Sequence, residues 1–413
     1  MLSSTFKRLI ILPIAGLISL AISACSLTSL SPVPAEHSVT SNDVRVQAFE
    51  NGLVPIDQAS EAQSMPTSIF DRMGARGVPG VGIAILHEGQ LIFSGGYGRL
   101  TSTDDGLVDG DTVFSAGSVS KVVNAVLVMR LVEAGILDLD TNIVEYLSSW
   151  QIPENELTEN QPVTLRHLLA HTSGFSVHGF QDYLPGSELP STTEILNGSG
   201  PAKNKPVEIL FTPGTSMKYS GGGVTVIQAI IEDVMKVPYE SAAKQYVFDP
   251  VGMTRSRFRN PLPETHGNIA KSHNKRGKPR ALPRGYESMP EVAASGLWTS
   301  ATDMGLLLQA LLSDETFLNS RTRQQFWTQQ SNSWHGLGPR INGNGDELIV
   351  HHGGANDHFK SWMEFHPSAG TGVIILTNGE DGRLLSYEIR VAIGEAFGWF
   401  AKFPEDYNDP EFQ

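Results

Sequence analysis

Cysteine is almost absent from this sequence, since Cys25 is the only one in 413 residues. A single cysteine excludes disulfide bonds within the chain. Basic residues are also scarce: 30 Lys and Arg stand against 44 Asp and Glu, which gives a formal net charge of -14. We therefore expect no nucleic-acid partner, because a nucleic-acid-binding protein needs a basic surface.

Two common hydrolase motifs are missing as well. The chain has no Gly-x-Ser-x-Gly sequence, which the nucleophile elbow of α/β hydrolases requires. His167 and His171 have metal-ligand spacing on a short predicted helix that begins at Thr164 and ends at Gly174, but no glutamate completes a His-Glu-x-x-His motif. We predict that this pair supports a loop, and that the protein uses neither a metal nor another cofactor.

An apolar run near the N-terminus predicts export. Residues 9–24 follow two basic residues, and serine and glycine interrupt them, which favours a secretory signal over a membrane span. The run ends in residues 22–25, Ile-Ser-Ala-Cys, which resemble the lipobox of bacterial lipoproteins. An ordinary signal peptide that carries a cysteine is the alternative. We predict a signal peptide and lipobox over residues 1–25, with lipidation at Cys25.

The resemblance to a lipoprotein implies a protein that is lipid-anchored to a membrane of the cell envelope. Ser26 after the cysteine implies the outer membrane, with the protein facing the periplasm, by the sorting rule of enterobacterial lipoproteins. Residues 26–58 are rich in Ser, Thr, Pro and Val and lack an apolar period, so we predict a flexible tether there. We predict that residues 401–413 form a C-terminal tail.

The strongest candidate for chemistry is the pair Ser118 and Lys121. Val122, Val123, Val126, Leu127, Leu131 and Val132 follow at helical spacing and predict a buried helix that ends near Gly135. Residues three apart share a helix face, so a neutral lysine amine can act as the base for the serine hydroxyl. The alternative is that Ser118 is a plain helix N-cap.

Spacing alone does not select this pair, because Ser-x-x-Lys also occurs at Ser4, Ser241 and Ser272. Ser4 lies in the targeting segment, Ser241 lies in a predicted surface helix, and Ser272 lies in a Lys/Arg-rich loop. Among these serines, only Ser118 has glycine before it and a long apolar helix after it.

Strand patterns occur at both ends of the chain and predict an α+β fold. Residues 81–86 and 90–97 form a hairpin pattern, and residues 347–354, 361–365 and 372–377 are strand-like. The middle of the chain is mostly helical in pattern. We expect one antiparallel sheet from both chain ends, flanked by helices, with a helical insertion at about 136–290 in a domain spanning 59–400.

Several motifs together resemble the serine β-lactamase and penicillin-binding-protein-like hydrolases, nearest the branch of class C β-lactamases, D-alanyl-D-alanine carboxypeptidases and family VIII-type esterases. The resemblance spans residues 59–399. The segments that carry it are 117–121, 168–174, 213–215 with Tyr219 and Ser220, 249–253, and 351–354. It implies the β-lactamase/transpeptidase-like fold and a serine hydrolase that forms an acyl-enzyme.

The resemblance also implies roles for individual residues. Ser118 is the nucleophile and Lys121 its general base or proton relay, while Tyr219 passes a proton to the leaving group. The backbone N–H groups of Ser118 and Gly354 form the oxyanion hole. His351 takes the place of the strand cation as a catalytic residue, and His352 and Gly353 bind substrate.

Two positions depart from the family pattern. Gly221 stands where asparagine is expected, so no side-chain amide there can hold Lys121 or a substrate carboxamide. His351 stands where β-lactamases have lysine, and a histidine is mostly neutral at pH 7. Both changes argue against efficient β-lactam hydrolysis.

The predicted substrate is a small molecule or peptide: a D-amino-acid peptide, a β-lactam-like compound or a short-chain ester. The alternative function is a penicillin-binding-like lipoprotein that senses or binds in the cell envelope without turnover. An acyl adduct on Ser118 that forms and never clears would distinguish the two. The sequence does not specify an oligomeric state.

Overall fold

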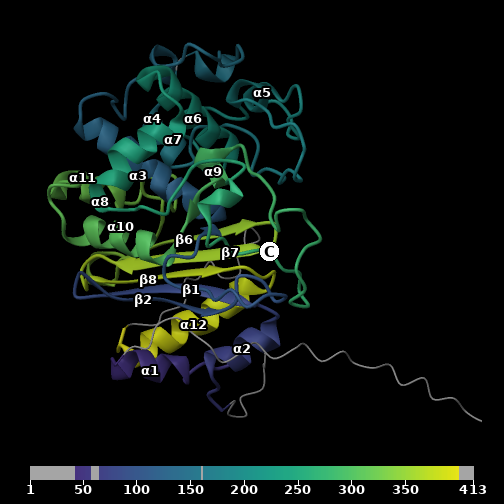
Figure 1. The fold of residues 1–413 in the computed structure, drawn as a ribbon. Coiled ribbons are helices and arrows are strands. Elements are labelled where there is room, and N and C mark those ends of the chain that lie inside the picture. The colour runs from purple at the N-terminus through teal and green to yellow at the C-terminus, as the bar shows by residue number, and fades with distance from the viewer. Residues whose placement is uncertain (1–41, 57–64, 160, 400–413) are drawn as a thin grey trace, which may run out of the picture.

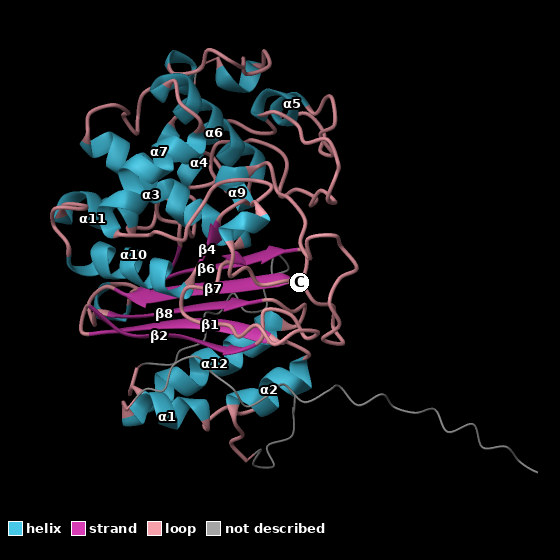
Figure 2. Cartoon of the chain, in the orientation of Figure 1, coloured by secondary structure: helices cyan, strands magenta, loops and turns pink. Residues whose placement is uncertain are grey.

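A six-stranded antiparallel sheet forms the centre of the molecule (Figures 1 and 2). The computed structural model describes residues 42–56, 65–159 and 161–399. The strand order is β2-β1-β8-β7-β6-β5, so β1 from the N-terminal part pairs with β8 from the C-terminal part. The strands are β1 (Gly80–His87), β2 (Gln90–Gly98), β5 (Arg340–Asn342), β6 (Ile349–Asn356), β7 (Phe359–His366) and β8 (Thr371–Thr377). The predicted sheet from both chain ends is confirmed.

Helices cover both faces of this sheet. On one face, α12 (Gly382–Ala396) packs with α1 (Val44–Glu50) and α2 (Ile69–Arg76) over a hydrophobic core that includes Phe49, Ile83, Ile375 and Ile389. On the other face, α10 (Ala301–Ser313) lies directly against β1, β2 and β8. Because helices cover both faces, β1 is buried along nearly its whole length and is apolar on both faces.

The remaining helices form a layer above α10 and the sheet (Figure 1). At its centre, α3 (Ser120–Glu133) is buried on nearly all sides, as its apolar residues predict. The two-stranded ribbon of β3 (Phe114–Ser115) and β4 (Trp298–Thr299) leads into it. The other helices are α4 (Leu165–Leu169), α5 (Thr192–Asn197), α6 (Gly221–Met235), α7 (Tyr239–Ala243), α8 (Asp249–Val251), α9 (Val292–Ser295) and α11 (Ser320–Phe326).

The N-terminal part differs from expectation at one place. Helix α1 lies inside residues 26–58, which we predicted as a tether, and its Val46 and Phe49 are buried against α12. Two buried side chains in two turns are too few to show a helical period in the sequence. The predicted signal and lipobox with Cys25, and the tail 401–413, lie outside the described residues. No helix in the described part of the chain is long and apolar enough to cross a membrane.

Candidate active site

Ser118 and Lys121 meet at the start of α3. Gly117–Val119 form a single 3₁₀ turn that continues into the helix, so the two side chains lie on one face as their spacing predicts. Lys121 Nζ donates to Ser118 Oγ at 3.2 Å and to the Ala294 carbonyl at 2.8 Å. The lysine is 4% exposed. These two contacts hold its amine beside the serine hydroxyl.

The turn that carries Ser118 packs directly on β6. Gly117 has φ +51°, and a Cβ added there would lie 2.5 Å from the Ala355 nitrogen. A Cβ at Gly354 would lie 2.1 Å from the Ala116 carbonyl oxygen. Both positions need glycine because the two backbones touch. Gly354, the predicted oxyanion donor, lines the cavity, and the Ala355 amide is a second candidate donor beside the turn.

Tyr219 lies on the opposite wall, just before α6. Its ring centroid is 4.9 Å from Lys121 Nζ. Imidazole rings surround it at centroid distances of 4.4 Å (His171), 5.0 Å (His178), 6.0 Å (His335) and 6.2 Å (His352). Tyrosine, lysine and serine are thus brought together as the resemblance implies. His171, for which we predicted a structural role, accepts from the Ser220 amide through Nδ1 at 3.2 Å.

The buried imidazoles around Tyr219 are neutral. Burial lowers the pKa of His171 and His352 well below the ordinary value and lowers the pKa of His335 to about 3. The positive charge of Arg340 acts in the same direction on all three rings. Arg340 is itself buried on β5, lines the cavity, and lies 5.9 Å from the Tyr219 ring centroid. The fixed positive charge at this wall is therefore a guanidinium and not an imidazolium.

The structure places His351 away from the cavity. Successive side chains of a strand point to opposite faces. His352 therefore faces Tyr219, whereas His351 faces the other side of the sheet, where its ring stacks on Trp362 at 5.4 Å. His352, and not His351, lines the cavity. The position that we predicted for His351 as a catalytic residue is thus occupied by His352, one residue later on β6.

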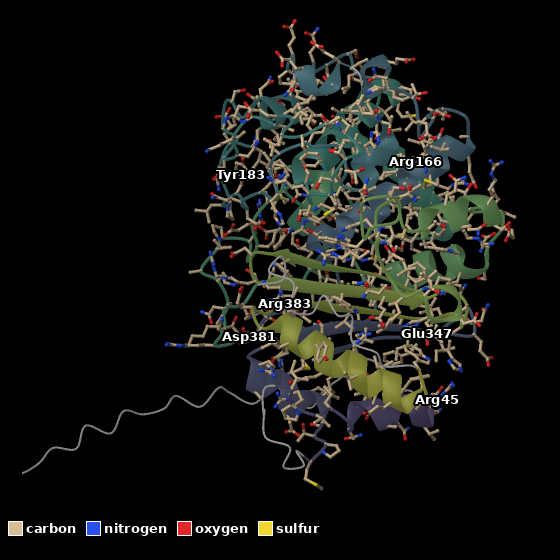
Figure 3. The ribbon with its side chains drawn as sticks, turned by 180° about the vertical axis from the view of Figure 1, so that it is seen from behind. Arg45, Arg166, Tyr183, Glu347, Asp381 and Arg383 are labelled. Atoms are coloured by element: carbon tan, nitrogen blue, oxygen red, sulfur yellow. The ribbon has the colours of Figure 1, made fainter. Side chains whose placement is uncertain are left out.

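These residues surround one cavity of about 590 Å³. It extends from Ser118 across β6 and β7 to the start of α12, where its only carboxylates among the described residues, Glu380 and Asp381, are found. Figure 3 shows Asp381 and Arg383 together at this end of the sheet, with Tyr183 in the helical layer above the same side. The described residues contain no cluster of three or more His, Cys, Asp or Glu that would hold a metal ion.

Sequence reasoning missed several cavity-lining residues, among them His178, Phe180 and Arg340. The first two lie in the connection between α4 and α5, whose path the sequence does not indicate. Arg340 follows Pro339 on a three-residue strand that carries no strand pattern. The glycine at 221 was the one available signal, because it indicated that something else fills the space of the missing asparagine.

Comparison with known proteins agrees with this geometry. The model of the Beta-lactamase family matches residues 67–393. Penicillin-binding protein 4 of Amycolatopsis lactamdurans is 31% identical over 201 residues, which are 48% of this chain and 49% of that protein. Protein flp of Staphylococcus aureus (strain MRSA252) is 23% identical over 76% of this chain and 62% of its own length. The chain thus spans 49% and 62% of the lengths of these two relatives.

Solved structures show the same fold. The octameric penicillin-binding protein homologue from Pyrococcus abyssi aligns with a TM-score of 0.62 and 24% identity, over 80% of this chain and 76% of that one. The structure of SurE with D-Leu aligns with a TM-score of 0.63 and 23% identity, over 81% of this chain and 76% of that one.

Proposed function

This chain belongs to the β-lactamase family, and we propose that it is a serine hydrolase that forms an acyl-enzyme on Ser118. The observation that carries the proposal is the hydrogen bond of 3.2 Å between Lys121 Nζ and Ser118 Oγ, at the floor of a cavity that also contains Tyr219. A hydroxyl, a buried amine in contact with it and a second proton donor are the groups that acyl transfer needs.

The proposed reaction begins when Lys121 accepts the hydroxyl proton of Ser118 as Oγ attacks the scissile carbonyl carbon. The carbonyl electrons move to oxygen, and backbone N–H groups of Ser118 and of Gly354 or Ala355 stabilise that charge. Losing one such donor typically costs roughly 10²–10³-fold in rate. The leaving group departs with a proton from Tyr219, and Lys121 returns its proton to Tyr219. Water then hydrolyses the ester on Ser118.

The proposed substrates are esters or amides: short-chain esters, D-amino-acid peptides or β-lactam-like compounds. Arg340 beside Tyr219 supports substrates with a carboxylate near the scissile bond, since arginine pairs with carboxylates in a bidentate manner. The solved structure of SurE with D-Leu supports D-amino-acid peptides as a class worth testing.

The test uses purified protein without the predicted signal sequence, a fluorophosphonate probe and p-nitrophenyl acetate. We expect labelling and hydrolysis by the wild type, and loss of both in Ser118→Ala. Ser241→Ala is the matched control, because Ser241 has the same spacing to a lysine but lies exposed on α7. Labelling that persists in Ser118→Ala would reject Ser118 as the nucleophile.

A second candidate function is binding without turnover, which the name of penicillin-binding protein 4 among the relatives supports. Gly221 also supports it, because no amide at this position can help turn over a bound β-lactam. Mass spectrometry after incubation with benzylpenicillin distinguishes the two functions. A stable adduct on Ser118 with no ester hydrolysis would favour the binding protein.

We further propose that the protein is exported and lipid-anchored through Cys25. The sequence of residues 22–25 and the basic start before the apolar run support this proposal. In a bacterial host supplied with an alkyne-labelled fatty acid, the wild type should incorporate the label and sediment with membranes. Cys25→Ser should lose both, and Ser29→Ala should keep both. Unchanged labelling of Cys25→Ser would contradict lipidation at this residue.

A further inference from the structure

Position 221 has no room for a side chain. Gly221 is the first residue of α6, and a Cβ added there would lie 2.9 Å from the ring of Phe180 and 3.0 Å from the carbonyl oxygen of His178. The ring would have to rotate away, and the backbone carbonyl would have to shift by a few tenths of an ångström. Phe180 therefore occupies the space that a residue at 221 would need.

The backbone holds the loop that carries Phe180 in place. The amides of Gly221 and Gly222 donate to the carbonyls of His178 and Val177, each at 3.0 Å. Those amides lie in the first turn of α6 and have no partners within the helix. Val177 adopts φ +62°, which is rare for a β-branched residue and persists only where the surroundings enforce it. Phe180 is thus a fixed wall of the cavity.

No other side-chain amide replaces the missing one. Asn356 is the only asparagine or glutamine among the described cavity-lining residues. Its Nδ2 donates to Ser115 Oγ and to the Ser295 carbonyl, each at 2.8 Å, and its Oδ1 accepts from Ser295 Oγ at 2.8 Å. Both N–H bonds of Asn356 are therefore used within the protein.

We infer that Phe180 makes the acyl part of the site selective for hydrocarbon acyl groups and against acylamino groups. A methylene chain gains free energy when its apolar surface is buried against the ring. An amide placed there loses its hydrogen bonds to water, and no protein group replaces them. The inference rests on the proposed function and deepens it. It names esters of unsubstituted aliphatic acids as the favoured substrates, ahead of N-acylated amino acids.

Two p-nitrophenyl esters of equal acyl-chain length measure this selectivity: the pentanoate and the N-acetylglycinate. The readout is the ratio of their kcat/KM values within each protein, after subtraction of the Ser118→Ala blank. We expect the wild type to favour the pentanoate by about tenfold or more, the discrimination that one unpaired polar group gives. Phe180→Leu should keep the preference, and Phe180→Ala should reduce it at least severalfold.

A double variant tests the steric part of the argument. Gly221→Asn alone should unfold at lower temperature, because its side chain meets Phe180 and the backbone of His178. In Phe180→Ala/Gly221→Asn the ring is gone and an amide is supplied, so the ratio should shift further toward the N-acetylglycinate. Leu184→Ala is the control in the same loop, since Leu184 is exposed and outside the cavity lining. Thermal unfolding reports whether each variant is folded.

The outcomes separate the two proposals. The selectivity inference is overturned if Ser118-dependent hydrolysis shows equal kcat/KM for both esters. It is also overturned if the ratio of the two kcat/KM values is unchanged in folded Phe180→Ala. Either result leaves the serine hydrolase in place. A wild type that hydrolyses no ester and takes up no fluorophosphonate overturns the hydrolase, and the selectivity inference with it.

Discussion

At the scale of the residue, burial separates Lys121 from Lys244, the lysine of another Ser-x-x-Lys motif. Lys121 is 4% exposed and contacts Ser118 Oγ, whereas the side chain of Lys244 is exposed and pairs with Asp249. We expect Lys121→Arg to lower kcat/KM for p-nitrophenyl acetate by roughly 10²–10⁴-fold, the usual contribution of general-base catalysis. Arginine has a similar length but stays protonated, so it cannot accept the hydroxyl proton of Ser118.

Lys244→Arg serves as the matched control and should retain wild-type kcat/KM, because its amine is outside the cavity. Both variants are compared by thermal unfolding, so that loss of activity is separated from loss of fold. Activity of Lys121→Arg within threefold of the wild type would show that another group deprotonates Ser118.

The sequence predicts the residue types of the site better than their directions. The pair His351 and His352 offers two rings to one position, and only the strand register decides which ring faces Tyr219. Family spacing alone did not fix that register. Phe180 was out of reach for a different reason: its place over Gly221 depends on the path of a loop, and loop paths follow from tertiary contacts rather than from local pattern.

At the scale of the element, the contact between the Ser118 turn and β6 depends on Gly117. We expect Gly117→Ala to lower kcat/KM at least tenfold and to destabilise the fold by more than about 1–2 kcal/mol, the cost of the left-handed conformation alone. The added methyl would meet the backbone of Ala355, so either the turn or β6 must move. The measurements are ester hydrolysis and urea unfolding.

Gly135 provides a matched control at the other end of α3. It also has positive φ, at +68°, but no atom lies within 4 Å of an added Cβ. Gly135→Ala should therefore cost only the conformational penalty and leave kcat/KM unchanged. Equal losses of activity in Gly117→Ala and Gly135→Ala would contradict a special role for the contact with β6.

Helix ends were the least predictable part of the elements. Helix α6 begins at Gly221, so its first three residues are all glycine. Glycine is a weak helix former, so local propensity argues against helical residues 221–223. Hydrogen bonds to the surroundings outweigh that preference. Ser220 Oγ accepts from the Gly223 amide at 2.8 Å, and the carbonyls of His178 and Val177 accept from the amides of Gly221 and Gly222. Such partners come from distant parts of the chain.

At the scale of the whole molecule, the sequence was sufficient to predict a sheet made from both ends of the chain. The apolar strands at the two ends of the chain need neighbouring strands to pair with. Because the segment between them is mostly helical, the strands from the two ends pair with each other. The pairing of β1 with β8 confirms this. The strand order and the two separate cores on either side of the sheet could not be predicted, because each depends on which faces the helices cover.

Stability of the whole molecule should depend on pH through Glu291, which precedes α9. Glu291 is 1% exposed, and neither carboxylate oxygen has a hydrogen-bond partner among the described residues. Burial raises its pKa from the ordinary 4.5 to about 8. Between these two pH values the carboxyl group of Glu291 is ionised in the unfolded chain and protonated in the folded chain. Folding there takes up a proton, so stability falls by about 1.4 kcal/mol for each pH unit of rise.

We expect Glu291→Gln to match the wild type near pH 4.5 and to melt higher at pH 8, by on the order of 5 °C. Glutamine keeps the shape of the protonated acid and cannot ionise.

Histidines with lowered pKa values, such as His335, change stability in the opposite direction below pH 6.5. Wild type and Glu291→Gln share these histidines, so their contribution cancels in the difference between the two proteins. Glu188→Gln, at an exposed position, should leave the pH dependence unchanged. Parallel melting curves for wild type and Glu291→Gln from pH 4.5 to pH 8 would show that Glu291 is ionised in the folded protein. Glu291 would then place a buried negative charge next to α9, the helix whose Ala294 carbonyl accepts from Lys121.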